Sequence, residues 1–373
     1  MFKKLFTFFA ALTLCVGLWA AAPVVGDQFV DATSGLKLEV TAVGEANTVK
    51  VIKNNYSGTA YEIPATVSYN NVDFAVTEIG KDAFTYCSSL QSVTLSEGLL
   101  TIGVSAFEEC SSLESIAIPA SVTTIGKDAF YNCSSLLSVT LSEGLLTIGE
   151  NAFEECSGLQ TIIIPASVTE IGAGAFGSSG LQTITIPAGV TEIGGTAFYD
   201  CESLQSVTLS EGLLTIGEAA FQSCVSLQSI TIPAGVTTIG EIAFAGSGLQ
   251  TITIPAGVIS LGMGAFAECA DLTSVTFLGN ACQGAIGELA FYEVGKDAPA
   301  LLTLHGTWAK ENQPDEDGNW YGGKFEMSSD PTALPSLPYE GKVGKGSFKF
   351  MHNGQLIIRK GNKHFNALGA EVK

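Results

Sequence analysis

A short motif recurs along most of this chain, and its period limits the fold more than any other feature. The stretch Leu204 to Ser226, LQSVTLSEGLLTIGEAAFQSCVS, is one of nine copies that run from Leu90 to Val294. Apolar and polar residues alternate in Val207-Thr208-Leu209, which is typical of a strand because successive side chains point to opposite faces. So short a strand cannot bury its apolar side alone, so we expect neighbouring copies to stack in register as a solenoid.

Glycines and prolines at fixed offsets predict a turn after each strand. Gly212 and Gly235 follow a strand, where a left-handed backbone costs a glycine little. Proline cannot donate a hydrogen bond to a sheet ladder, so strand pairing should stop where the strand ends in Ile-Pro. Five copies have this ending, at Pro119, Pro165, Pro187, Pro233 and Pro255. A second short apolar segment follows, and an Ala-Phe pair then begins a return that is either a tight turn or a single helical turn.

The phenylalanine of the Ala-Phe pair is the predicted centre of the core, where it should stack on its equivalents. Most spacings in the series are 23 residues, two are 22 and the last is 25. The two short spacings follow Phe176 and Phe244, where the loop lacks both the cysteine of the other copies and one residue. The cysteine and the longer loop therefore occur together, which indicates that the cysteine is a buried wedge that fills space in the core and has no chemical role. The predicted core residues are Phe84, Phe107, Phe130, Phe153, Phe176, Phe198, Phe221, Phe244, Phe266 and Phe291.

The repeated pattern LxxIxIPxxVTxIGxxAFxxC resembles the BspA-like leucine-rich repeat family of bacterial and protozoan cell-surface proteins. The resemblance covers roughly residues 60 to 294. It implies a curved, right-handed leucine-rich repeat solenoid that is β-rich, with parallel strands stacked on one face. It also implies adhesion or binding to a host partner. The motif residues shared by the family are core and turn residues, so they point to no particular partner.

Charge restricts the partners of the repeats. Between Glu78 and Val294 there are 22 Asp or Glu residues and two basic residues, Lys81 and Lys127. The net charge of this segment, −20, equals that of the whole chain. Such a surface repels phosphate backbones, so we expect no nucleic-acid partner. Basic partners fit the surface, and solubility is a second explanation of the charge. No spaced Asp loop of the EF-hand kind occurs, and we expect no metal or other cofactor.

Seven cysteines share one repeat offset. Secretion would permit disulfides. However, parallel cysteines that point side by side into a core rarely reach disulfide geometry. The sequence also lacks the CxxC pair that a zinc site would be expected to contain. We therefore expect a buried row of free thiols. The seven are Cys87, Cys110, Cys133, Cys156, Cys201, Cys224 and Cys269, whereas Cys282 in the divergent last copy has no assigned role.

Two surfaces are candidates for binding. Most outward strand positions are Ser or Thr, as in Ser206/Thr208, with Ala117 and Ile163 as exceptions. These hydroxyls could meet carbohydrate, but Thr also suits any half-exposed strand, and the face lacks the aromatic or Arg anchors of many interfaces. Variation between copies lies instead beside the Ala-Phe turn. There we place the candidate partner-binding residues Glu108, Glu109, Tyr131, Glu154, Glu155, Tyr199 and Asp200, although solvated edge residues would look the same.

The ends of the chain differ from the repeats. Residues 1–22 read as a secretory signal peptide, because Lys3 and Lys4 precede an apolar run that ends in small residues. Residues 23–77 alternate apolar and polar residues and read as a β-rich N-terminal cap on the 78–294 solenoid. A C-terminal cap containing Trp308 and Trp320 should occupy 295–330, with a binding pocket as the alternative. No other run is long and apolar enough to span a bilayer.

A proline-rich linker over 331–338 separates the repeats from a basic tail. The tail, 339–373, reads as short strands joined at Asn353-Gly354 and Gly361-Asn362. Its last 25 residues or so resemble the C-terminal secretion and sorting tails of Bacteroidetes proteins, which implies export or surface attachment. The other reading is a basic β-module that packs on the acidic solenoid.

Nothing in the repeats resembles a catalytic constellation. The three histidines, His305, His352 and His364, lie outside the repeats, so the many serines have no base for a nucleophilic triad. We therefore expect a secreted or cell-surface protein that mediates adhesion or protein binding and is not an enzyme. The expected partners are host matrix proteins or surface proteins of other cells. A glycan-binding or purely structural surface protein is the alternative, and the oligomeric state stays open.

Overall fold

The computed structural model describes residues 21–279, 282, 285–305 and 313–328, together with the backbone of five strands between 341 and 372. Residues 1–20 of the proposed signal peptide, Trp308 and the proposed linker lie outside these residues. Among the described residues, no helix is long or apolar enough to cross a lipid bilayer.

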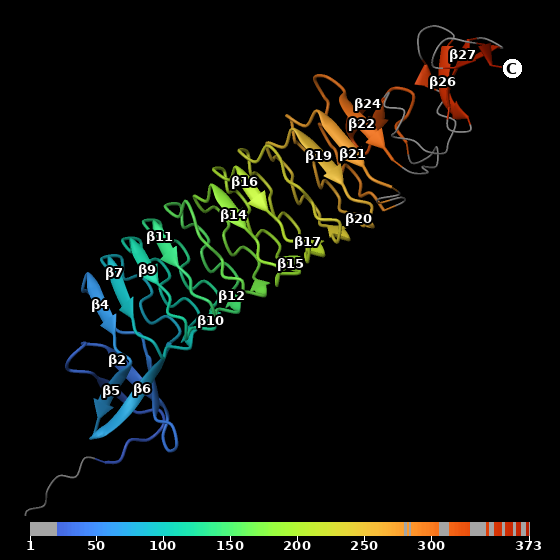
Figure 1. Cartoon of the computed structure of the whole chain (residues 1–373). Helices are drawn as coiled ribbons and strands as arrows, with labels where there is room; N and C mark the ends of the chain where they lie inside the picture. Colours follow the sequence, from blue (N-terminus) through green and yellow to red (C-terminus); the bar gives the residue numbers. More distant parts are fainter. Residues whose placement is uncertain are drawn as a thin grey trace, which may run out of the picture.

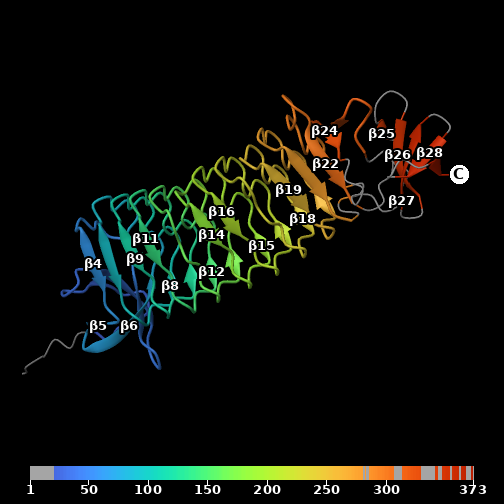
Figure 2. The ribbon, with the colours of Figure 1, turned by 45° about the horizontal axis from the view of Figure 1, so that its top comes forward.

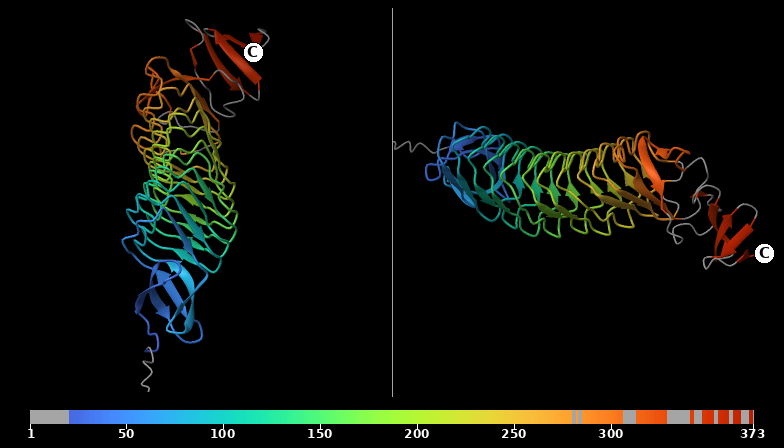
Figure 3. Two further views of the ribbon diagram at one scale, coloured as in Figure 1. Left: turned by 90° about the vertical axis from the view of Figure 1, so that its left-hand side faces the viewer. Right: turned by 90° about the horizontal axis from the view of Figure 1, so that it is seen from above.

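The chain winds into a long, curved solenoid, as the sequence predicts (Figures 1 and 3). A first ladder is formed by the strands at the start of each turn, which pair in parallel so that Val93 lies beside Ile116 and Ile116 beside Val139. Its strands are β4 (Ala60–Ile63), β7 (Ser92–Leu95), β9 (Ser115–Ala117), β11 (Ser138–Thr140), β14 (Thr183–Thr185), β16 (Ser206–Thr208), β19 (Thr251–Ile254), β21 (Ser274–Phe277) and β22 (Ala300–Leu304).

A second parallel ladder lines another side of the solenoid (Figure 2). Parallel strands therefore occupy two sides of the solenoid, one more than the sequence predicts. In each copy, the strand of the second ladder comes after the strand of the first ladder and places one buried Ile or Leu in the core. Its strands are β6 (Val72–Ile79), β8 (Thr101–Ile102), β10 (Thr124–Ile125), β12 (Thr147–Ile148), β13 (Glu170–Ile171), β15 (Glu192–Ile193), β17 (Thr215–Ile216), β18 (Thr238–Ile239) and β20 (Ser260–Leu261). Except for β6, each of these strands has only two residues, which are too few for a period to show in the sequence.

Glycine follows the second strand because the backbones of neighbouring turns touch there. A Cβ on Gly240 would lie 2.6 Å from the backbone of Gly217 and of Glu218 in the preceding turn. Close approach of the backbones also explains Gly212, where the sequence predicts a left-handed conformation instead. Its φ lies outside the left-handed region, and a Cβ there would lie 2.8 Å from the carbonyl oxygen of Ala188. Gly235 also lacks the predicted left-handed backbone.

A β-rich cap covers the N-terminal end. The strands β1 (Gln28–Val30), β2 (Lys37–Ala42) and β3 (Thr48–Val51) are antiparallel, and β3 then pairs in parallel with β6. The strand β5 (Thr66–Tyr69) also pairs with β6, in the antiparallel sense. Cap and second ladder therefore form one continuous sheet as far as β13.

A column of stacked rings runs through the core. The ten phenylalanines predicted from the spacing are fully buried, and consecutive rings lie 5.2–5.6 Å apart with interplanar angles of 1–9°. Tyr56 stacks on Phe84 at one end, and Trp320 stacks on Phe291 at the other. Trp320 belongs to the hairpin of β23 (Asn319–Trp320) and β24 (Gly323–Met327), and β24 extends the first ladder by pairing with β22.

The first ladder is interrupted twice. Residues 161–164 hold a single bridge between Thr161 and Thr183 in place of a strand, and residues 229–232 form no strand. Each interruption falls in a copy that is one residue shorter than its neighbours. We attribute the interruptions to this deletion, because a shorter chain must span the same circumference.

The tail strands form a sheet of their own beyond the C-terminal end of the solenoid (Figure 1). They are β25 (Gly341–Lys342), β26 (Ser347–His352), β27 (Gln355–Lys360), β28 (Lys363–Asn366) and β29 (Glu371–Val372), and all neighbours are antiparallel. The Asn-Gly and Gly-Asn residues that were expected to form turns, between β26 and β27 and between β27 and β28, lie outside the described residues.

Candidate partner-binding edge

Each return of the chain is a five-residue turn centred on a stacked phenylalanine, such as 128–132 around Phe130. We call the row of these turns the return-turn edge. The backbone is left-handed two residues before the phenylalanine, as at Asp128, and two residues after it, as at Asn132. Asp and Asn tolerate this conformation better than most residues. Of the two forms that the sequence allowed, the returns are tight turns, and no helix occurs in the described residues.

Backbone hydrogen bonds hold these turns in register. The amides of Asp128, Phe130 and Asn132 donate to carbonyl oxygens of the next turn over 2.8–2.9 Å. The turns around Phe107 and Phe153 repeat the arrangement. Residues at the same offset therefore lie side by side along the edge.

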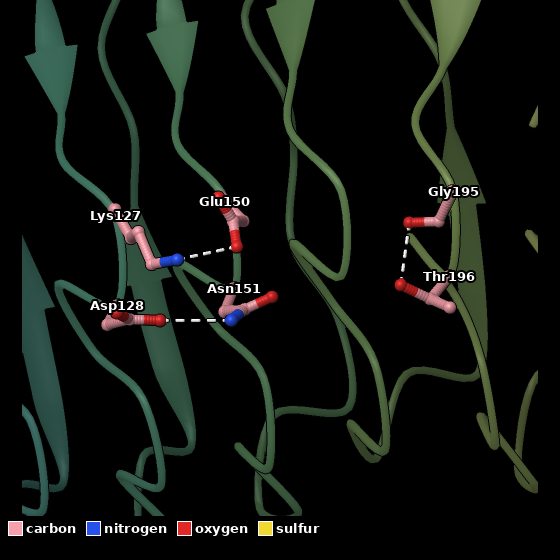
Figure 4. Close-up of polar contacts among 6 residues, drawn as sticks. All are labelled: Lys127, Asp128, Glu150, Asn151, Gly195 and Thr196. Atoms are coloured by element: carbon pink, nitrogen blue, oxygen red, sulfur yellow. Dashed lines mark hydrogen bonds and ion pairs between the residues drawn. The ribbon is translucent and has the colours of Figure 1, made fainter.

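Side chains at equal offsets bond across the turns (Figure 4). Lys127 Nζ lies 2.6 Å from Glu150 Oε1, and Asn151 Nδ2 donates to Asp128 Oδ1 over 3.0 Å. Further along the edge, Thr196 Oγ1 donates instead to the adjacent backbone oxygen of Gly195. The first two pairs are thus ordered across neighbouring turns, whereas Thr196 bonds within its own turn.

The structure brings five of the seven candidate residues together. Glu108 and Glu109, then Tyr131, then Glu154 and Glu155 occupy three consecutive turns, and all five are partly exposed. Tyr131 donates its hydroxyl to Glu155 Oε1 over 2.8 Å, which spans two of these turns. Asn132 Nδ2, which was not among the candidates, donates to Glu109 Oε2.

Tyr199 and Asp200 lie apart from this cluster. The turn around Phe176, with Gly177 and Ser178 at the equivalent positions, separates them from Glu154 and Glu155. The seven residues therefore share one edge but form two groups.

The carboxylates of the larger group affect the ionisation of their neighbours. Burial, followed by the charges of Glu155, Asp128 and Glu150, raises the pKa of Glu154 above its ordinary value. The hydrogen bond to Glu155 raises the pKa of Tyr131 to about 12. The Tyr131 phenol therefore remains a neutral donor well above physiological pH, with Glu155, Glu154 and Glu109 around it.

The sequence reasoning missed Asn132, which bonds to Glu109, and four further polar residues that pair with one another on the neighbouring turns. Lys127, Asp128, Glu150 and Asn151 lie on the other side of the phenylalanine from the candidates, and they were not compared at their common offsets. That comparison would have paired Asp128 with Asn151 directly, because both precede the phenylalanine by two residues.

Two of the copies that have Ser-Glu-Gly after the first strand, at 96–98 and 142–144, bond to the Pro-Ala-Ser turn of the next copy. Glu97 of one copy accepts hydrogen bonds from the backbone amides of Ala120 and Ser121 in the next, and Ser121 Oγ accepts one from Gly98. Glu143 and Ser167 repeat this pairing. These glutamates therefore serve as turn caps, and only part of the acidic surface is free to meet a partner.

The repeat cysteines are buried free thiols. Six of them donate from Sγ to the carbonyl oxygen of the phenylalanine in the preceding turn, over 3.0–3.2 Å. The two short copies place Ser179 and Ser247 at this position, three residues after the phenylalanine. The column therefore carries a hydrogen-bonding group even where the cysteine is missing, which the idea of a simple wedge did not include.

No set of His, Cys, Asp or Glu in the described residues is arranged to hold a metal ion. The outward Ser and Thr of the first ladder are mostly exposed, as are the exceptions Ala117 and Ile163, the latter with 84 % of its surface accessible. This face offers hydroxyls and scattered apolar side chains such as Ile163 and Leu301, whereas the return-turn edge offers ordered carboxylates, amides and a phenol.

Comparison with known proteins identifies relatives of the repeats. Residues 65–182 and 169–296 match the family model of the BspA-type leucine-rich repeat region. No curated protein matches the chain.

Solved structures of bacterial leucine-rich repeat proteins are similar. One from Bacteroides ovatus is 26% identical with a TM-score of 0.50, over 72% of this chain and 70% of that one. A leucine-rich cell surface protein from Faecalibacterium prausnitzii is 25% identical with a TM-score of 0.48, over 82% and 94%. A leucine-rich repeat protein from T. pallidum is 27% identical with a TM-score of 0.46, over 51% and 87%.

Proposed function

Because this chain belongs to the BspA-type leucine-rich repeat family, we propose that it is a secreted or cell-surface protein that mediates adhesion or protein–protein binding without catalysis. The family supports a protein-binding or structural role. Adhesion, secretion and the absence of catalysis go beyond what the family supports and are part of our proposal. A net charge of −20 favours basic partner surfaces and disfavours nucleic acid.

The observation that carries the proposal is the order of the return-turn edge. Side chains from three successive turns are fixed by the bonds of Tyr131 to Glu155 and of Asn132 to Glu109. A surface whose side chains are already fixed loses less entropy on binding than a surface of free side chains. The residues also differ from copy to copy, so the edge presents one distinct pattern instead of a repeat.

The proposal is tested by binding to purified host matrix proteins and to isolated surface proteins of coexisting cells. The edge variant combines Glu108→Gln, Tyr131→Ser, Glu154→Gln and Tyr199→Ser, and the control variant carries Ser206→Ala and Thr208→Ala on the first ladder. We expect the edge variant to lose at least about tenfold in affinity and the control to bind normally. Equal binding by wild type and edge variant would exclude the edge as the site.

The alternative is a glycan-binding or purely structural surface protein. Only the exposed hydroxyls of the first ladder favour a glycan. A glycan array separates the two proposals, since a selective sugar whose binding is lost in the Ser206→Ala, Thr208→Ala variant would favour the alternative.

Export is proposed from the two ends of the chain. The first 22 residues act as a signal peptide in this proposal, and the basic tail acts as a sorting or attachment module. Mass spectrometry of the protein recovered from its native cell surface tests both, because it gives the first and last residues of the mature chain.

A further inference from the structure

A second surface of the return-turn edge, nearer its C-terminal end, is apolar. Met263, Leu289 and Tyr292 are exposed by 47, 50 and 42 %. Ile242 adjoins them, because its amide donates to the carbonyl oxygen of Met263 in the next turn. We call these four residues the apolar patch. It shares no residue with the candidates of the proposed function, so its test stands whether or not those residues bind a partner.

Successive turns build the patch. Ile242, Gly264 and Leu289 occupy the same offset, two residues before their phenylalanines. The missing side chain of Gly264 leaves room for Ile242, whose Cγ2 lies 3.0 Å from where a Cβ of residue 264 would stand. Leu289 in turn lies against the loop of the last hairpin, with Cδ2 3.2 Å from the equivalent point on Gly322.

The backbone at this offset argues against a purely structural role for the two aliphatic side chains. Ile242 and Leu289 are left-handed, with φ of 46° and 55°. In the other turns that the structure describes, this offset holds only small or polar residues, so Ile242 and Leu289 are the two large aliphatic ones. The others are Asp82, Ser105, Asp128, Asn151, Gly174, Thr196, Ala219 and Gly264. Strained residues of this kind cluster at functional sites. Here the strained residues are also the ones that make the surface apolar.

The rim of the patch is acidic. Glu241 and Glu288 directly precede Ile242 and Leu289, and the turn that contains Met263 and Gly264 lies between the two pairs. Glu268 lies on the other side, with its amide 2.7 Å from the carbonyl oxygen of Tyr292. All three carboxylates are on exposed residues.

Beyond Tyr292 the charge changes. A pocket of about 340 Å³ is lined there by Lys296 and Lys324, and Lys296 pairs with Glu293 over 2.8 Å. The acidic rim therefore ends at Tyr292, where Lys296 and Lys324 begin to line the surface.

We propose that the apolar patch docks a basic, amphipathic segment of a partner protein. Its Leu, Ile or aromatic side chains cover Ile242, Met263, Leu289 and Tyr292, and its Arg or Lys side chains meet Glu241, Glu268 and Glu288. Apolar contacts at the centre with charges at the rim are the usual anatomy of a protein interface. The opposite charges set the orientation of the segment and speed its association.

The test uses the full-length protein and a short synthetic peptide in which Leu and Trp alternate with Arg. Leu289→Asn and Ile242→Asn each remove apolar surface while placing a residue that suits the left-handed backbone, so the turn is kept. Leu214→Asn is the matched control, because Leu214 is equally exposed at 48 % but lies outside the patch. Anisotropy titrations should show saturable binding that is about tenfold weaker in each patch variant and unchanged in the control.

Two further peptides separate the contributions of charge and apolar contact. Replacing every Arg by Glu should abolish binding, and replacing Leu and Trp by Ser should leave only weak binding that disappears in high salt. The proposal is overturned if the first peptide does not bind, if it binds the patch variants like wild type, if Leu214→Asn weakens it equally, or if the Glu peptide binds as well.

Discussion

At the scale of single residues, the positions that decide the geometry of the return turns are hidden in the sequence. The left-handed offset before the phenylalanine holds Asp128, Asn151, Thr196, Ile242 and Leu289 in different copies, which share no property that predicts the backbone. The conformation comes from the hydrogen bonds between turns. By contrast, the phenylalanines could be placed from their spacing alone, because each must fill the same space in the core.

We expect Ile242→Asn to stabilise the protein by about 1 kcal/mol, because a left-handed backbone is costly for a β-branched residue and tolerable for Asn. The reverse change, Asn151→Ile, should destabilise it by about 1–3 kcal/mol, since it adds that strain and removes the bond from Nδ2 to Asp128. Denaturant unfolding of both variants checks the pair. If the two changes shift the free energy of unfolding in the same direction, the account of strain fails.

The buried thiols predict a loss of stability at alkaline pH. Burial raises the pKa of the Cys201 and Cys269 thiols from 9.0 to about 11, and that of Cys156 to about 12. Between these values the unfolded chain releases protons that the folded chain keeps. The free energy of unfolding should therefore be highest below about pH 9 and should fall as pH rises toward about 11.

Replacing Cys201 by Ser isolates this effect, because Ser179 and Ser247 already occupy the same offset in the short copies. The variant should fold, and its loss of stability between pH 8 and 10.5 should be smaller than that of wild type by about 1–2 kcal/mol. In native wild-type protein the thiols should also resist alkylation and be unbridged by mass spectrometry. Disulfides between turns, or an identical alkaline loss in the variant, would contradict the prediction.

At the scale of elements, the sequence predicts the first ladder but not the second. Alternation in segments such as Val207-Thr208-Leu209 indicates a strand, and the Phe-to-Phe spacing sets the register. After β6, the strands of the second ladder, such as β17, contain two residues each, and two residues cannot show a period. The interruptions of the first ladder were also not foreseen, although the missing residue that accompanies them was visible after Phe176 and Phe244.

The glycines of the second ladder test how closely the turns approach. Gly240→Ala should destabilise the protein by about 1–3 kcal/mol, because its Cβ would lie 2.6 Å from backbone atoms that cannot move independently. Gly177→Ala is the control, since its Cβ would meet other atoms only at 3.5 Å. Thermal unfolding of both variants is the measurement. Equal effects would mean that loss of glycine flexibility, and not contact between turns, sets the cost.

At the scale of the whole molecule, ring stacking continues beyond the repeats at both ends. Tyr56 and Trp320 extend the phenylalanine column, so each end of the core meets an aromatic ring from a different kind of element. The sequence indicated that the last tryptophans close the core, but it could not show that Trp320 stacks in line with Phe291. That placement depends on the hairpin of β23 and β24, whose strands are two and five residues long.

The candidate binding site was less predictable than the fold. Variation beside the Ala-Phe turn directed attention to the return-turn edge, but Tyr199 and Asp200 lie a full turn away from the main cluster. The sequence does not indicate the apolar patch, because Ile242, Met263, Leu289 and Tyr292 are ordinary residues spread over 50 positions of the chain. Only the stacking of the turns brings them together.

We expect deletion of residues 331–373 to leave the thermal stability of the purified protein nearly unchanged. Among the described strands, the five of the tail pair with one another in one sheet, and the hairpin of β23 and β24 places Trp320 on Phe291. In the native host the same deletion should reduce secretion or surface display, because the tail is proposed as an export or attachment module. Calorimetry and quantification of the protein on the cell surface are the measurements.

Electrostatic docking of the tail on the acidic repeats predicts a different result. The segment 339–373 carries seven Lys or Arg and two Glu residues, opposite in sign to the repeats. If it packed on them, deletion would lower the unfolding temperature at low salt and have a smaller effect at high salt, because exposed charge pairs are screened. The full chain and the truncated chain should therefore be compared at both salt concentrations. A salt-dependent loss of stability combined with normal secretion would assign the tail to the folded solenoid and remove its proposed role in export.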